Sequence, residues 1–316
     1  MRICRQSSGN RAVRLGWRYN NRLLEKLLTE QPNPASEGID RKSTGEILRT
    51  INAEDQLVAV SIVPEIGLIS EAVDAIVERL QLGGKLFYIG AGTSGRLGVL
   101  DAAECRPTFQ VAEDLVQGII AGGERALARA TEASEDSAQS GADDLAVRGF
   151  QPGDALVGIA ASGRTPYVLG AIAKARAMGA LTIGISCTPE SELSRAVEIS
   201  IAPLPGPEII AGSTRMKAGT ATKLVLNMIS TGVMIRLGYV YGNRMVNLAP
   251  TNAKLRARAE GIVAELAGVD AWQAQELLRA AGDSVRVAVL MAKKQWTRAE
   301  AERELESAGG RWGELL

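Results

Sequence analysis

The sequence predicts an α/β protein built on a doubly wound parallel sheet of about five strands, with helices on both faces. Short apolar runs, each bounded by Gly, Asp or Pro, alternate with helical segments, as in successive βαβ units. The runs are continuous, which is typical of strands buried on both faces. They lie at residues 85–90, 116–121, 155–160, 181–186 and 197–202. Residues 166–178 predict a helix, with Pro at its first position and Gly after its last.

Around this α/β domain, which we place at residues 81–250, the chain is expected to be helical. Residues 1–22 are an Arg-rich, acid-free extension that we expect to be disordered, although such a start also resembles a transit peptide. Residues 23–80 form an N-terminal helical segment, in which Ser43 and Thr44 followed by Glu46 indicate a helix start. A helix is expected at 217–237, and the composition of residues 251–316 predicts a bundle of about three short helices.

The composition excludes several classes of protein. With 36 basic and 36 acidic residues the net charge is zero, which argues against a nucleic-acid-binding surface. The chain has no histidine, so a Ser-His-Asp triad and a histidine-ligated zinc are excluded, and carboxylates are the first candidates for acid–base chemistry. The three cysteines are far apart, so we expect no disulfide framework and a reducing compartment. No apolar stretch reaches the roughly 18 residues of a membrane-spanning helix, so no membrane contact is expected.

The first of three candidate ligand loops follows the strand at 85–90 and opens a helix. It reads Gly-Ala-Gly-Thr-Ser-Gly from residue 90, which is the spacing of a dinucleotide fingerprint. Thr93, Ser94 and Gly95 also suit a compact phosphate, because hydroxyls and a close backbone can surround an anion at a helix start. The acid expected after the second strand for a ribose is replaced by Ala-Gly-Gly, which argues against a dinucleotide.

Two further loops combine hydroxyls, glycine and a helix start. Their candidate residues are Ser162, Gly163 and Thr165 in the second loop and Ser213, Arg215 and Lys217 in the third. Each set alone is explained by ordinary N-capping. Because all three loops follow parallel strands at the edge where such sheets bind ligands, together they predict a site for a phosphorylated small molecule. Arg96 and Arg164 either add charge-assisted bonds to that site or lie on a solvated surface.

Glu104 is the carboxylate best placed to move protons near these loops. On the helix after the first loop, Leu97, Leu100 and Glu104 are spaced to share one face, which we expect to be buried. Burial and repulsion from Asp101 would favour protonated Glu104 near neutral pH; the alternative is an exposed helix carboxylate. Glu135 is less clear, because a regular helix over 124–137 would turn it to the solvated side.

Taken together, the longer runs are similar to the N-acetylmuramic acid 6-phosphate etherases. This family carries the sugar isomerase domain and is related to the glucokinase regulatory protein. The matching runs are residues 90–98, 101–105 with 107–108, 120–124, 158–167, 184–187, 213–220, 223–232 and 251–254. The resemblance extends from about residue 23 to the C-terminus, and it departs slightly around Glu104, at Ala103 and Arg106.

The resemblance implies a carbon–oxygen lyase that cleaves the lactyl ether of N-acetylmuramic acid 6-phosphate by elimination and then water addition. The products are N-acetylglucosamine 6-phosphate and D-lactate, and the setting is cytoplasmic recycling of cell-wall sugars. It also implies a homodimer without metal or cofactor. The resemblance carries the family's proton donor to Glu104 and its second catalytic carboxylate to Glu135, and leaves their division of acid and base roles open. For Glu135 it outweighs the helical spacing, so we expect an irregular segment or one that faces a dimer cleft.

Other functions remain open from the residues. A non-catalytic sugar-phosphate sensor would bind the sugar phosphate and release no lactate, and a phosphosugar aldose–ketose isomerase would leave the ether intact. A nicotinamide oxidoreductase would carry a cofactor visible by absorbance. A DNA-binding regulator is disfavoured, because the net charge is zero and no separate basic helix-turn-helix is evident.

Overall fold

A parallel sheet of five strands forms the centre of the protein. A computed structural model describes residues 28–129, 134–248, 250–308 and 315–316. The strands lie in the order β2-β1-β3-β4-β5, and each is parallel to its neighbours. They are β1 (Leu86–Gly90), β2 (Val116–Ile120), β3 (Ala155–Ile159), β4 (Leu181–Ile185) and β5 (Ile199–Ile201). All five predicted strands are confirmed, and the order reverses between β1 and β3, as in other doubly wound sheets.

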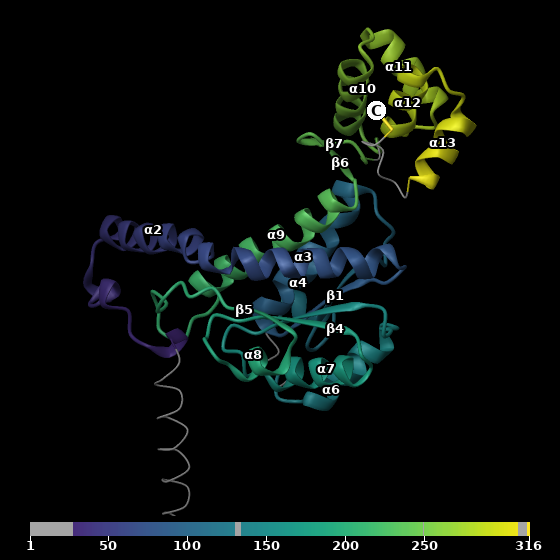
Figure 1. Ribbon diagram of the computed structural model, residues 1–316. Helices are drawn as coiled ribbons and strands as arrows, with labels where there is room; N and C mark the ends of the chain where they lie inside the picture. Colours follow the sequence, from purple (N-terminus) through teal and green to yellow (C-terminus); the bar gives the residue numbers. More distant parts are fainter. Residues whose placement is uncertain (1–27, 130–133, 249, 309–314) are drawn as a thin grey trace, which may run out of the picture.

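Helices cover both faces of the sheet (Figure 1). On one face lie α3 (Ile66–Gln81), α4 (Gly92–Phe109) and α9 (Lys217–Arg236). On the other lie α6 (Ala138–Val147), α7 (Pro166–Ala177) and α8 (Glu192–Ala196). Along β1, Tyr88 enters the first core, whereas Phe87 and Ile89 enter the second. Because both faces are covered, the strands carry continuous apolar runs.

Local sequence sets the helix boundaries. At the start of α2 (Thr44–Val60), Ser43 and Glu46 form a capping box, and Glu46 Oε2 accepts the Ser43 backbone N–H at 2.9 Å. Pro166 begins α7, and Gly179, with φ +75°, follows its end. All three boundaries agree with the sequence prediction.

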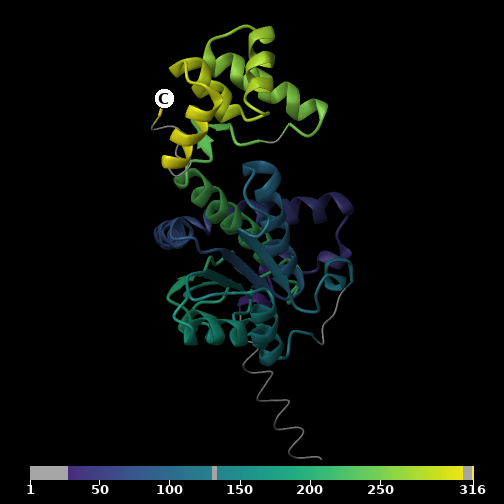
Figure 2. The same cartoon turned by 90° about the vertical axis from the view of Figure 1, so that its right-hand side faces the viewer.

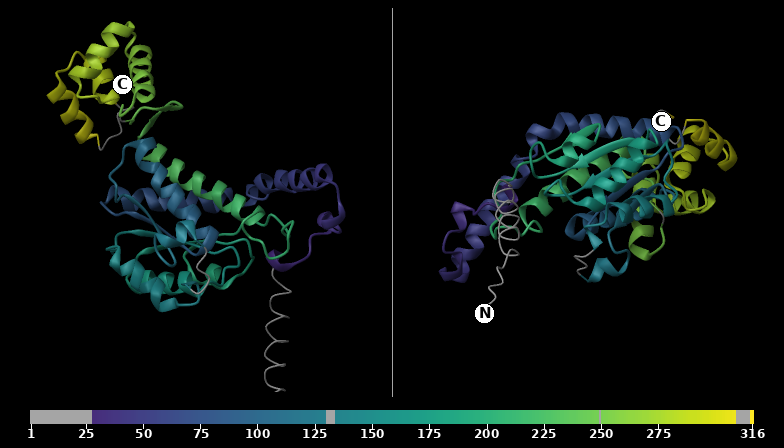
Figure 3. Two further views of the ribbon diagram at one scale, coloured as in Figure 1. Left: turned by 180° about the vertical axis from the view of Figure 1, so that it is seen from behind. Right: turned by 90° about the horizontal axis from the view of Figure 1, so that it is seen from below.

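Helix α2 projects away from the sheet (Figure 3). Val58 is its one buried residue, whereas Leu57 and Val60 are 52% and 66% exposed. Most of the stability of a protein helix comes from packing an apolar face, so α2 presents an apolar surface without cover in the single chain. The predicted extension at residues 1–22 lies outside the described residues.

The C-terminal helices pack around a core of their own (Figure 2). Four helices lie there in the described residues, α10 (Ala253–Ala267), α11 (Ala271–Ala280), α12 (Val285–Lys294) and α13 (Arg298–Ser307), so the expectation of about three was too low. A capping box of Asp270 with Gln273 starts α11 and separates it from α10. A hairpin of β6 (Val240–Tyr241) and β7 (Arg244–Met245), which the sequence analysis missed, joins α9 to this bundle. The domain limits themselves stay predictions.

Across the described ranges, every helix is too short or too polar to cross a bilayer. Cys105 and Cys187 are buried free thiols, and burial raises the pKa of each to about 12. Neither thiol is therefore suited to act as a thiolate at neutral pH.

Asp101 on α4 is a partly buried carboxylate between the sheet and α9. Its Oδ1 accepts the Ser230 hydroxyl at 3.1 Å. The fully buried Tyr88 hydroxyl interacts with this carboxylate. Burial raises the pKa of Asp101 above its ordinary value.

We predict that Asp101→Asn changes how stability depends on pH. Because the folded chain binds this proton more tightly than the unfolded chain, the carboxyl stabilises the fold below its unfolded pKa. That contribution is lost as pH rises through the raised value. The asparagine side chain does not titrate. The free energy of unfolding of the variant minus that of the unmodified chain should therefore be larger at pH 8 than at pH 4. Urea unfolding at both values checks this, with exposed Asp143→Asn as control; an equal difference at both pH values would contradict it.

Candidate functional site

The three predicted ligand loops meet around the start of α9. A small apolar cluster there joins Val58 of α2, Cys187 after β4, and Ala218 and Ala221 of α9, with Ala161 of the second loop packed against it. The first loop also reaches this point, because a Cβ placed on Gly219 would lie 3.5 Å from the Thr93 methyl carbon. The structure therefore brings together the loops that the sequence predicted as one site.

The first loop leaves the start of α4 open. Its N-cap residue, Ala91, offers no side-chain hydrogen bond, whereas α6, α8 and α10 to α13 all begin with a side-chain cap. Thr93 and Ser94 are half-buried on this first turn. A Cβ on Gly95 would lie 2.5 Å from the Gly90 carbonyl oxygen, so only glycine allows this close approach of helix and strand. The open N-terminus of α4 is a favourable position for an anion.

In the second loop the hydroxyls are not used as ordinary caps. Thr165 is the N-cap residue of α7 but its side chain makes no capping hydrogen bond. Ser162 Oγ accepts only a long bond, 3.4 Å, from the Arg164 backbone N–H. Gly163 has φ +65° and packs on Ser191, where a Cβ would lie 2.2 Å from the serine side chain. Capping therefore does not account for Ser162 and Thr165.

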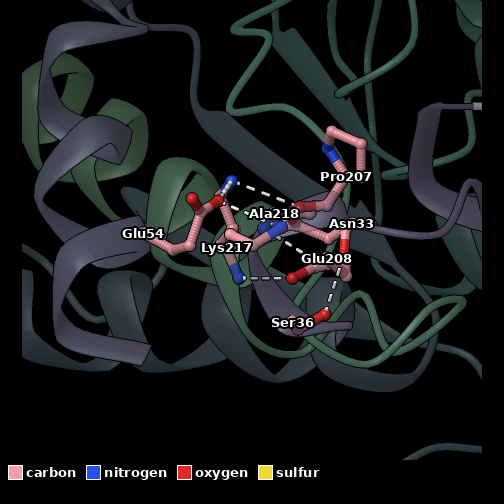
Figure 4. Close-up of polar contacts among 8 residues, drawn as sticks. Asn33, Ser36, Glu54, Pro207, Glu208, Lys217 and Ala218 are labelled. Atoms are coloured by element: carbon pink, nitrogen blue, oxygen red, sulfur yellow. Dashed lines mark hydrogen bonds and ion pairs between the residues drawn. The ribbon is translucent and has the colours of Figure 1, made fainter. Parts of the chain in front are cut away.

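The third loop differs from the prediction at Lys217. The Lys217 side chain is 1% exposed, and its ammonium pairs with Glu54 Oε2 at 2.6 Å (Figure 4). It also donates to the Pro207 carbonyl at 3.2 Å. We predicted a phosphate contact from this lysine; the structure turns it inward because a carboxylate from α2 takes its charge. Ser213 is half-buried and Arg215 is exposed, so both remain candidates for ligand contact.

A second carboxylate in this region, Glu208, was missed by the sequence analysis. It is 1% exposed and accepts the backbone N–H groups of Lys217 and Ala218 at 2.8 and 2.9 Å. Burial raises the pKa of Glu208 against the opposing effect of these bonds. The start of α9 is thus already occupied by a carboxylate, which a search for hydroxyls and cations cannot detect.

The two other arginines have protein partners. Arg96 donates from Nε to the Leu127 carbonyl at 3.1 Å and from Nη2 to the Arg129 carbonyl at 3.3 Å. Arg164 lies 3.7 Å from Glu192 in an exposed ion pair. Arg96 thereby holds the end of α5 (Arg125–Ala128), and neither arginine is reserved for a ligand in the single chain.

Glu104 is exposed, contrary to our expectation of burial. The buried face of α4 consists of Gly95, Gly98, Ala102, Cys105 and Phe109. Leu97, Leu100 and Glu104 do share a face, but it lies at the margin of the core: Leu97 packs partly against the core, whereas Leu100 is 52% exposed. The spacing correctly predicted that the three side chains share a face, but our expectation that Glu104 is buried was wrong.

Glu135 lies in an irregular segment, which confirms the expectation drawn from the resemblance. Helix α5 ends at Ala128 and α6 begins at Ala138, so no regular helix spans 124–137 in the described residues. Glu135 is half-buried, and its carbonyl accepts the Tyr167 backbone N–H at 3.0 Å. This bond fixes Glu135 beside the start of α7 and hence beside the second loop.

An open groove of about 1060 Å³ runs along the edge strand β2, between α4 and α6. Ala103 and Ser134, the sequence neighbours of Glu104 and Glu135, line it, but the hydroxyls of the three loops do not. We therefore place the candidate site at the converging loops rather than in this groove. In the described ranges, no three His, Cys, Asp or Glu residues cluster as a metal site.

This chain is similar over most of its length to known N-acetylmuramic acid 6-phosphate etherases. The N-acetylmuramic acid 6-phosphate etherase of Rhodopirellula baltica is 49% identical over 93% of this chain and 97% of its own. That of Aeromonas hydrophila is 52% identical over 91% of this chain and 96% of its own. The family model of the glucokinase regulatory protein N-terminal SIS domain matches residues 68–176. Among solved structures, a phosphoheptose isomerase from Francisella tularensis is 20% identical, with a TM-score of 0.48, over 61% of this chain and 99% of that one.

Proposed function

We propose that this chain, which belongs to the N-acetylmuramic acid 6-phosphate etherase family, releases D-lactate from that amino sugar phosphate. The observation that carries the proposal is identity of about half of all residues over almost the whole length of both chains. Two features support it. The start of α4 has no side-chain cap, and the hydroxyls of Ser162 and Thr165 do not cap a helix, so both can bind the 6-phosphate. We assign the reaction to the cytoplasm and to recycling of cell-wall sugars.

The proposed chemistry needs two proton transfers in the elimination, two more in the addition of water, and no redox step. In the open-chain sugar the aldehyde acidifies the C2 proton, and a carboxylate removes it. The bond from C3 to the lactyl oxygen breaks as a carboxylic acid protonates that oxygen, which makes the reaction a carbon–oxygen lyase. Water then adds to C3 of the unsaturated aldehyde, which restores the hydroxyl, and C2 takes up a proton. The hydroxyl loops use binding of the remote phosphate to orient the reacting carbons.

Glu104 and Glu135 are our candidates for these proton transfers. Glu104 lies on α4, which begins in the first loop. Glu135 is held beside the second loop by the hydrogen bond that its backbone carbonyl accepts from the Tyr167 N–H. We assign to Glu104 the protonation of the lactyl oxygen and the later activation of water, with Glu135 assisting as base. Positioned proton transfers of this kind contribute about 10²–10⁴-fold each.

We further propose that the active form is a homodimer. Glu104 is exposed beside exposed Leu100, although an acid–base group needs a water-poor site. Helix α2 likewise exposes Leu57 and Val60. A second copy that covers these apolar surfaces would supply the missing burial for both.

We predict that Glu104→Gln lowers lactate release from N-acetylmuramic acid 6-phosphate by about 10²-fold or more, and that Glu135→Gln also lowers it. The amide keeps the size of the side chain but cannot exchange the proton. A coupled lactate assay measures the rate, and Glu306→Gln on the exposed face of α13 is the matched control. Full turnover by Glu104→Gln would reject this residue. Sugar phosphate binding without lactate release by the unmodified chain would favour a sensor.

We predict that Leu57→Lys on α2 weakens self-association, because a charge would enter an apolar contact. Sedimentation velocity across a range of protein concentrations measures the dimer fraction. Leu82→Lys is the control, since Leu82 is 86% exposed in the turn after α3. A monomeric unmodified chain, or a dimer fraction that Leu57→Lys leaves unchanged, would contradict this arrangement.

A further inference from the structure

A buried charge cluster fastens the third loop, and the proposed chemistry does not use it. The cluster consists of Glu54 on α2, Glu208 in the segment between β5 and α9, and Lys217 at the first position of α9, with Asn33 beside them (Figure 4). Glu208 and Lys217 are each 1% exposed, and the Glu54 side chain is 15% exposed. Such burial of charge is costly unless every member has partners.

Every member of the cluster does have partners. Glu54 Oε2 accepts from Lys217 Nζ at 2.6 Å and from Asn33 Nδ2 at 2.9 Å. The hydrogen bond from Lys217 holds the pKa of Glu54 below its usual range, so Glu54 is ionised at neutral pH. Buried ion pairs contribute little stability compared with apolar packing. The cluster is therefore better explained by its effect on the geometry of the third loop than by a gain in stability.

The contacts fasten the third loop on both sides of its ligand candidates. On one side, the Pro207 carbonyl accepts from Lys217 Nζ and from Asn33 Nδ2, and the Gly212 backbone N–H donates to the Thr29 carbonyl at 2.8 Å. On the other side, Glu208 binds the first N–H groups of α9. Between these points the loop carries Ser213 and Arg215.

We propose that Glu54, Glu208 and Lys217 are positioning residues that fix Ser213 and Arg215 against the phosphorylated sugar. This inference rests on the proposed function and refines it. Lys217 acts through the loop and does not touch the phosphate, because its ammonium is buried and donates to Glu54 and to the Pro207 carbonyl. The 6-phosphate charge is then met by Arg215 and by the open start of α4.

The charge-neutral replacements Glu54→Gln, Lys217→Met and the double variant test this assignment. A positioning role predicts that Glu54→Gln and Lys217→Met each raise KM for the etherase substrate by about tenfold or more, with a smaller change in kcat. The double variant should have a lower KM than Lys217→Met alone, because it leaves no unpaired buried charge. A direct phosphate contact predicts the reverse: Glu54→Gln would free the lysine and leave KM unchanged or lower, and the double variant would not recover.

Binding of N-acetylglucosamine 6-phosphate, measured by calorimetry in the same variants, separates this inference from the proposed function. It requires no turnover, so the predicted order of affinities holds even if the unmodified chain releases no lactate. Glu54→Gln keeps its side-chain size and is partly exposed, so it serves as the test if Lys217→Met does not fold, as judged by thermal melting. The exposed pair Lys85–Asp114, altered by Lys85→Met, is the matched control and should leave KM and affinity unchanged. Unchanged affinity in Glu54→Gln would overturn the proposal.

Discussion

Close packing at the start of α9 determines whether the three loops form one site. Ala218 and Ala221 lie against Cys187, Val58 and Ala161, so segments from α2, the second loop and the end of β4 meet over small side chains. A larger residue at Ala218 or Ala221 would push these segments apart, because a close-packed interior has no spare volume. The sheet supplies the common edge, and α9 brings the loops together at that edge.

The absence of histidine makes carboxylate environments decisive. A glutamate becomes an effective acid–base near neutral pH only where water is largely removed. In the single chain, Glu104 is exposed and Glu135 is half-buried. The proposed dimer therefore does more than add stability, since it completes the surroundings in which either carboxylate would work.

The sequence predicted the sheet well because strands buried on both faces leave a local, continuous apolar pattern. It also identified the three loops, since their hydroxyls and glycines are local features. It failed at Glu104, because which face of α4 is buried depends on where α9 packs. It could not predict that Lys217 is buried and paired, because Glu54, which neutralises the lysine, lies 163 residues away in the chain. Glu208 was missed for another reason: an isolated glutamate shows no local sign that it caps a helix.

The central claim is that the converging loops recognise the phosphate of a sugar. Calorimetric titration of the unmodified chain with N-acetylglucosamine 6-phosphate and with unphosphorylated N-acetylglucosamine tests it most directly. We expect the phosphorylated sugar to bind at least about a hundredfold more tightly, since charge-assisted bonds to the phosphate carry much of the affinity. Equal affinity for the two sugars would contradict the account.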